Sequence, residues 1–134
     1  MKTFAKLLTT SLCVVGLAAG CEKSTVQGDA GKKLTLVKPI NQSITRGETE
    51  KVSVVVARTN FDGPVMVRFD DLPRGVSLVD TVTNINGNEN EKVFVLKAAA
   101  DADLVKSHRA TVSATGPDGM TVKEQFEITI KEKA

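Results

Sequence analysis

The stretch Lys51-Val52-Ser53-Val54-Val55-Val56-Ala57-Arg58 decides the fold of this chain. Valines at positions 52, 54 and 56 alternate with Ser53, Val55 and Ala57, and this period of two is typical of a β-strand. Branched side chains such as valine also pack well on a pleated, half-buried surface. The stretch therefore predicts a long strand that is buried on at least one face.

The same alternation continues on both sides of this strand, from Lys33 to the end of the chain. The expected inward positions are Leu34, Leu36, Ile40, Val65, Val67, Phe69, Val76, Leu78, Val82, Phe94, Leu96, Ala98, Ala110, Val112, Ala114, Phe126, Ile128 and Ile130. Residues 45–48, 59–64, 72–75 and 116–119 are expected to turn, 84–90 to form a polar loop, and 101–106 to cross over. About seven short strands without a convincing helix predict an all-β fold, an antiparallel β-sandwich.

Proline and lysine interrupt the first expected strand. Pro39 cannot donate to a sheet ladder, and Lys38 beside it discourages pairing with another chain. We therefore expect this strand to lie at a protected edge of its sheet, and we find no equally clear protection on the other strands.

The first 20 residues have the pattern of an export signal. Lys2 and Lys6 precede an apolar run of about 13 residues, which is too short to span a membrane. The run ends in Leu17-Ala18-Ala19-Gly20-Cys21, which resembles the lipobox of bacterial lipoproteins. This resemblance implies cleavage after Gly20 and lipidation of Cys21. In the family's sorting rule, an aspartate after the cysteine retains the protein in the inner membrane. Because Glu22 stands at that position, the resemblance implies the outer membrane.

Removal of residues 1–20 leaves 114 residues, enough for one domain. Lys2 and Lys6 leave with the signal, so 16 basic residues then balance 16 acidic ones. Without a basic cluster, a nucleic-acid partner is rejected. Cys13 lies in the signal and Cys21 at the cut, so we expect no disulfide and no cofactor other than the covalent lipid. Residues 21–32 are short, polar and without period, and are predicted to form a flexible tether to a sandwich over residues 33–132.

Two motifs resemble immunoglobulin-like modules of bacterial secreted and surface proteins. Residues 58–67 contain an Arg-x-x-Phe-x-Gly-Pro-Val pattern, and residues 71–76 contain Leu-Pro-x-Gly-Val. Residues 96–102 and 114–116 match as well, so that the resemblance covers about residues 34–131. It implies an immunoglobulin-like sandwich, of a branch without the Cys–Trp–Cys core, with a role in spacing, adhesion or binding.

We expect no catalytic residues. His108 is the one histidine, and with Ser107 or Ser113 it lacks the nucleophile-elbow pattern of a hydrolase. Neighbours in a strand point to opposite faces, so Asp70 and Asp71 are not expected to form an acid–base pair. A hydrolase is therefore the least favoured class.

Calcium and sugar binding remain alternatives. Asp101 and Asp103 form an Asp-x-Asp pair, but the spacing does not match the twelve-residue calcium loop. Oxygen-bearing side chains also crowd one loop, at Asn84, Asn86, Asn88, Glu89 and Glu91. Sugar faces usually use exposed Trp or Tyr, and this chain has neither. Phe61 is the one aromatic residue expected in a loop, where packing is the favoured interpretation.

The sequence therefore predicts a lipid-anchored envelope protein with one β-sandwich. It is expected to act as a non-enzymatic interaction or structural module, in contact with the membrane through its lipid and with an envelope protein partner.

Overall fold

The valine-rich stretch forms β4 (Thr49–Thr59), the long central strand of one of two packed sheets. The structure is a computed structural model, which describes residues 22–134. Val52, Val54 and Val56 are buried, and the residues between them are more exposed. The predicted strand and its inward face are thus confirmed.

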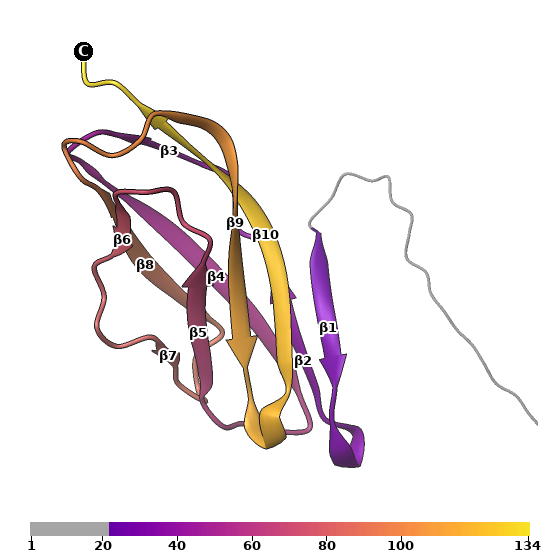
Figure 1. Cartoon of the computed structure of the whole chain (residues 1–134). Coiled ribbons are helices and arrows are strands. Elements are labelled where there is room, and N and C mark those ends of the chain that lie inside the picture. The colour runs from indigo at the N-terminus through magenta and orange to yellow at the C-terminus, as the bar shows by residue number, and fades with distance from the viewer. Residues whose placement is uncertain (1–21) are drawn as a thin grey trace, which may run out of the picture.

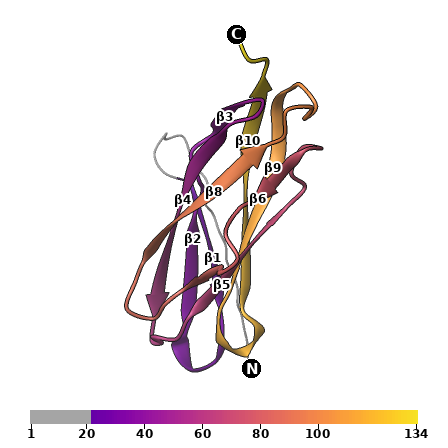
Figure 2. The same cartoon turned by 90° about the vertical axis from the view of Figure 1, so that its left-hand side faces the viewer.

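Ten strands in the described part of the chain form two five-stranded sheets (Figures 1 and 2). The first sheet has the order β1 (Lys23–Gln27), β2 (Lys33–Val37), β4, β8 (Glu91–Ala98) and β6 (Val76–Leu78). The second has the order β3 (Gln42–Thr45), β10 (Thr121–Lys131), β9 (Val105–Thr115), β5 (Val65–Asp70) and β7 (Asn84–Ile85). Two short 3₁₀ turns, η1 (Asp29–Gly31) and η2 (Pro117–Gly119), close the β1–β2 and β9–β10 hairpins.

This strand order is that of an immunoglobulin-like sandwich. Strands β2, β4, β8 and β6 correspond to the A-B-E-D sheet of that fold, and β5, β9 and β10 to its C-F-G sheet. All pairings are antiparallel except that of β3 with β10, in which Gln42 lies opposite Ile128. The all-β, immunoglobulin-like sandwich predicted from the sequence is confirmed.

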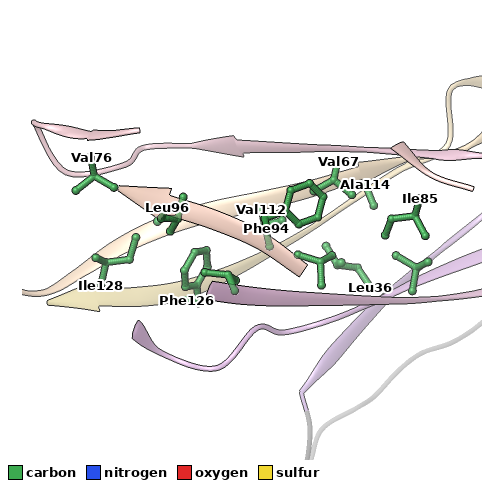
Figure 3. Packing of buried hydrophobic residues seen from close by; sticks show 14 of the residues in the cluster. Leu36, Val67, Val76, Ile85, Phe94, Leu96, Val112, Ala114, Phe126 and Ile128 are labelled. Atoms are coloured by element: carbon green, nitrogen blue, oxygen red, sulfur yellow. The ribbon is translucent and has the colours of Figure 1, made fainter. Parts of the chain in front are cut away.

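The core lies between the two sheets and is built mostly from the predicted inward positions (Figure 3). Phe94 of the first sheet and Phe126 of the second are almost fully buried. Phe69 packs edge-on against both rings, with centroids 5.4 Å from Phe94 and 6.1 Å from Phe126. Edge-to-face pairs of this kind add roughly 0.5–1.5 kcal/mol beyond the area they bury. Aromatic contacts thus join the two sheets. Residues 22–134 contain no cysteine and no tryptophan that could do so instead.

Two predictions for the first strand are wrong: its position at a sheet edge and the inward direction of Ile40. The chain changes sheets at Pro39, so β2 and β3 belong to different sheets. The change breaks the period of two, and Ile40 is 81% exposed whereas Ile44 of β3 is buried. β2 is not an edge either, because β1 covers its outer side.

Two expectations for residues 76–90 also need correction. β6 ends at Leu78, and Val82 is 63% exposed. Beyond the end of β6, the Asp80 carboxylate accepts a hydrogen bond from the backbone N–H of Val95 at 2.7 Å. The expected polar loop at 84–90 begins with strand β7, which pairs with Val65 and Met66 of β5. Ile85 is fully buried there, as the single apolar side chain of that loop.

The expected flexible tether is folded in its described part. β1 pairs with β2 along its whole length, and the Thr25 and Thr35 hydroxyls are 2.8 Å apart. The backbone N–H of Lys38 donates to the carbonyl of Glu22 at 2.8 Å, so order extends to the first described residue. The reason is long-range: Val26 packs against a core that the local sequence does not reveal.

The signal segment, the cleavage site after Gly20 and the lipid on Cys21 lie outside the described residues. Within residues 22–134, no helix is long and apolar enough to cross a membrane.

Candidate binding groove

A broad groove lies on the outer face of the second sheet. Its floor and walls are the outward side chains of β5, β9 and β10, and its volume is about 1310 Å³. Glu22 and Lys38, from the segments that flank β1 and β2, line it as well. The groove therefore begins beside the first described residue of the chain.

The register of the three strands places the groove residues in rows. From one end, the rows are Met66–Thr115–Thr121, Arg68–Ser113–Lys123, Asp70–Thr111–Gln125 and, on β9 and β10 alone, Arg109–Glu127. The middle strand β9 supplies short hydroxyl side chains in three of these rows. Thr111 is 9% and Ser113 7% exposed, because longer neighbours on β5 and β10 rise on both sides. The result is a trough with a hydroxyl floor and charged walls.

Most acidic groups of the groove are already paired. Asp70 accepts a hydrogen bond from Nε of Arg68 at 3.0 Å, and Glu22 forms an ion pair with Lys38 at 3.7 Å. The Glu124 carboxylate, at the edge of β10, accepts a hydrogen bond from the Ser24 hydroxyl of β1. These contacts leave Lys123 without an ion-pair partner among the described residues.

The structure does not bring His108 together with a nucleophile. Nε2 of His108 lies 2.7 Å from the backbone carbonyl oxygen of Asp71, and the Asp71 carboxylate accepts from the Thr111 hydroxyl at 3.1 Å. Ser113 is five residues further along the same strand, roughly 17 Å away at the rise of an extended chain. Ser107 instead donates its backbone N–H to the Thr129 hydroxyl. Asp70 and Asp71 also have separate partners, so their side chains serve as local structural contacts.

The oxygen-rich loop at residues 84–91 surrounds a cation that the chain itself supplies, the guanidinium of Arg58. It donates to the carbonyl oxygens of Ile85 at 3.0 Å, Asn86 at 2.8 Å and Glu89 at 2.5 Å, and to that of Gly63 at 2.9 Å. Partial burial lowers the pKa of Arg58, with Asp62 and Glu89 opposing the shift, but an arginine remains charged at any physiological pH.

Two further groups of the sequence's candidate calcium ligands have partners in the protein. Nζ of Lys92 donates to the Asn84 carbonyl oxygen at 3.3 Å and to that of Val82 at 2.9 Å. Asp103 accepts two hydrogen bonds from Arg74, at 2.6 and 3.1 Å, and this contact lowers the pKa of the Asp103 carboxyl. Across residues 22–134, no three His, Cys, Asp or Glu side chains gather where they could share a metal ion.

Sequence reasoning missed the groove, although the alternation of Thr111, Ser113 and Thr115 was visible. The floor is recognisable as such only once β5 and β10 lie on either side of β9. Phe61, the loop aromatic, is partly buried against the core, as the packing interpretation expected.

Comparisons with known proteins return only structural likenesses. No family model matches the chain, and no curated protein matches its sequence. Among solved structures, a chimeric titin Z1Z2 carrying an exogenous decorin peptide aligns with 87% of this chain and 100% of its own, at 16% identity and a TM-score of 0.44. The complex of titin M10 with an obscurin-like 1 Ig domain aligns with 86% of this chain and 99% of its own, at 13% identity and a TM-score of 0.45. The twitchin kinase region of C. elegans aligns with 70% of this chain and 15% of its own, at 17% identity and a TM-score of 0.39.

Proposed function

We propose that this chain is an exported bacterial lipoprotein, acylated on Cys21 after cleavage behind Gly20, which acts as a non-enzymatic interaction module of the cell envelope. The lipobox-like stretch at residues 17–21 supports the anchor. The immunoglobulin-like sandwich supports the module, since folds of this class present surfaces and loops for binding. The observation that carries the interaction role is the groove over β5, β9 and β10.

The folded start of the chain gives the anchor a structural consequence. Only Glu22 stands between the proposed lipidated cysteine and β1, and its carbonyl already accepts from Lys38. A lipid on Cys21 would hold the sandwich directly against the bilayer, with the Glu22 and Lys38 end of the groove nearest to it. The expected location is the outer membrane, because Glu22 follows the cysteine.

Fractionation of cells that express the full-length protein tests the anchor. Wild type and the matched control Cys13→Ser should remain in the membrane fraction, since Cys13 lies in the part that is removed. The N-terminal peptide of the mature protein should begin at Cys21 and carry the mass of its acyl chains. Cys21→Ser should yield an unprocessed or released protein without that mass. Normal processing and membrane retention of Cys21→Ser would refute the lipoprotein assignment.

The interaction role is tested separately by cross-linking in intact cells through a tag after Ala134, which lies at the exposed C-terminus. Membranes are then purified and the cross-linked products identified by mass spectrometry. One stoichiometric protein partner supports the proposed module. Recovery of the protein alone would favour the alternative, a calcium- or glycan-binding module, for which about 1 mM Ca²⁺ should raise the melting temperature. A hydrolytic activity that is lost in His108→Ala would favour the hydrolase hypothesis.

A further inference from the structure

Ser113 stands out among the groove residues, because its side chain is buried and has no hydrogen-bond partner among the described residues. The residue is 7% exposed on the outward face of β9, and its hydroxyl makes no hydrogen bond to another described residue. Buried polar side chains are nearly always paired, so a hydroxyl that lines a groove without a protein partner is a candidate contact for a bound molecule. The hydroxyl faces the middle of the groove, which it lines.

Two cations flank this hydroxyl in the same row of the sheet. Arg68 lies opposite Ser113 on β5, and Lys123 lies opposite it on β10. The Arg68 side chain is 78% exposed, and its contact with Asp70 uses Nε, so both terminal nitrogens remain available. Lys123 is exposed and forms no ion pair in the described chain. An anionic group above Ser113 would thus meet three hydrogen-bond donors.

We propose that the groove binds an extended peptide segment of a partner protein that presents apolar, acidic and basic side chains in turn on one face, with its carboxylate seated on Ser113 between Arg68 and Lys123. This inference rests on the proposed interaction module and names its surface and ligand chemistry. Hydrogen bonds from a cationic side chain to a carboxylate are stronger than those between neutral groups. A carboxylate is therefore the group that Arg68 and Lys123 would hold best. Met66, in the adjacent row, is 57% exposed and offers an apolar contact.

The spacing of the rows favours an extended peptide. Successive rows are two residues apart along β9, about 7 Å in an extended chain. Side chains on one face of an extended peptide repeat at the same distance, so an acidic residue over Ser113 places its second neighbour over Met66 and Thr115. The next residue on the other side would face Asp70, where a basic side chain fits. The preferred ligand therefore alternates apolar, acidic and basic side chains on one face.

Binding of synthetic peptides to the purified full-length protein in detergent tests the carboxylate seat. The probes are a labelled peptide with valine, aspartate and lysine in turn at every second position, separated by serine, and its matched form with asparagine in place of aspartate. We expect the aspartate peptide to bind about tenfold or more tightly than the asparagine peptide. Arg68→Gln and Lys123→Gln should each weaken it by about tenfold. The control Lys51→Gln, exposed on β4 of the other sheet, should leave affinity unchanged. Equal affinity for both peptides, or no binding of either, would overturn the proposal.

Photo-cross-linking in cells separates a failure of this inference from a failure of the proposed module. One variant carries a photoreactive residue in place of Gln125, an exposed groove residue outside the carboxylate seat. Its control carries the photoreactive residue in place of Val93, which is 48% exposed on β8 of the other sheet. A protein adduct at position 125 that Arg68→Glu abolishes supports the peptide groove. Protein adducts at position 93 alone overturn the groove while the proposed module stands. Adducts at neither position, with no partner through the C-terminal tag, overturn both proposals. An adduct at position 125 that muramidase degrades would show that the ligand is a glycan and not a peptide.

Discussion

Nη2 of Arg58 lies 3.0 Å from the carbonyl oxygen of Ile85, a contact that joins the end of β4 in one sheet to β7 in the other. Arg58 continues the inward series of Val52, Val54 and Val56, so its stem leaves the core where the sandwich opens to solvent. Its guanidinium then holds the polar loop after β7 through backbone carbonyls, which gives it a role that depends on geometry and not on an acidic partner.

Replacing Arg58 should therefore destabilise the domain. Arg58→Met keeps most of the apolar stem but leaves four carbonyl oxygens without their donor, and we expect a loss of about 2–3 kcal/mol in the free energy of unfolding. Urea denaturation followed by circular dichroism measures it. The control Arg109→Met, at an exposed site, should change stability by less than about 0.5 kcal/mol. Similar losses for both variants would show that the Arg58 contacts contribute little.

Gly75 and Gly47 provide a matched pair of glycine substitutions. Both have positive φ, +90° and +79°, which costs an L side chain roughly 1–2 kcal/mol. A Cβ at Gly75 would also lie 2.6 Å from Cα of Ala102, whereas nothing lies within 4 Å at Gly47. Gly75→Ala should therefore lower the melting temperature clearly more than Gly47→Ala does. Equal shifts in thermal denaturation would contradict the close approach of the loop at Ala102 to Gly75.

The pH dependence of stability should report the contact between Arg74 and Asp103. The hydrogen bond from Arg74 lowers the pKa of Asp103 in the folded state, so the folded protein binds a proton less readily than the unfolded chain does. This contribution is present above the unfolded-state pKa, about 3.9, and is lost as the pH falls through the lower folded-state value. Asp103→Asn should therefore lower the melting temperature at pH 7 and have no effect at the acid end of a pH series.

High salt provides the control for that measurement, because the pair is exposed and screened. At about 1 M NaCl the difference between wild type and Asp103→Asn should shrink. A difference that is independent of both pH and salt would mean that asparagine acts through something other than the lost charge.

Hydrogen exchange should show that β1 is part of the domain. The amides of Lys23–Gln27 that pair with β2 should exchange more slowly than those of the C-terminal residues 132–134, which lie outside the strands. Mass spectrometry of the exchanged full-length protein resolves the two segments. Equally fast exchange in residues 23–27 and 132–134 would support the flexible tether that the polar sequence predicts.

Much of the fold could be predicted because side-chain alternation is a local property. Val52, Val65, Phe94 and Phe126 stand in runs of period two, and such runs state which side chains face inward before any partner strand is known. The turn residues added the strand limits. Ile40 shows where this logic ends, since a change of sheet at Pro39 resets the period and the sequence does not mark the reset.

The candidate groove was beyond sequence reasoning for a related reason. Ser113 lies in one row with Arg68 and Lys123, of which the first is 45 positions away and is brought close only by the pairing of β5 with β9. Arg58 likewise reaches carbonyl oxygens up to 31 positions along the chain. Arg58 opens the Arg-x-x-Phe-x-Gly-Pro-Val pattern, but the carbonyl oxygens that it contacts and the short hydroxyl side chains of the groove floor carry no distinctive spacing.

The sequence by itself determined the strand composition, most of the inward faces and turns, and the resemblance to an exported lipoprotein with an immunoglobulin-like domain. Only the tertiary structure decided that residues 23–27 add a strand, that Ile85 is buried, that Arg58 occupies the oxygen-rich loop, and that Ser113 lies unpaired between two cations. The physical reason is that alternation is set by neighbours along one chain segment. The burial and the hydrogen bonding of a side chain also depend on the distant strands that the fold places beside its segment.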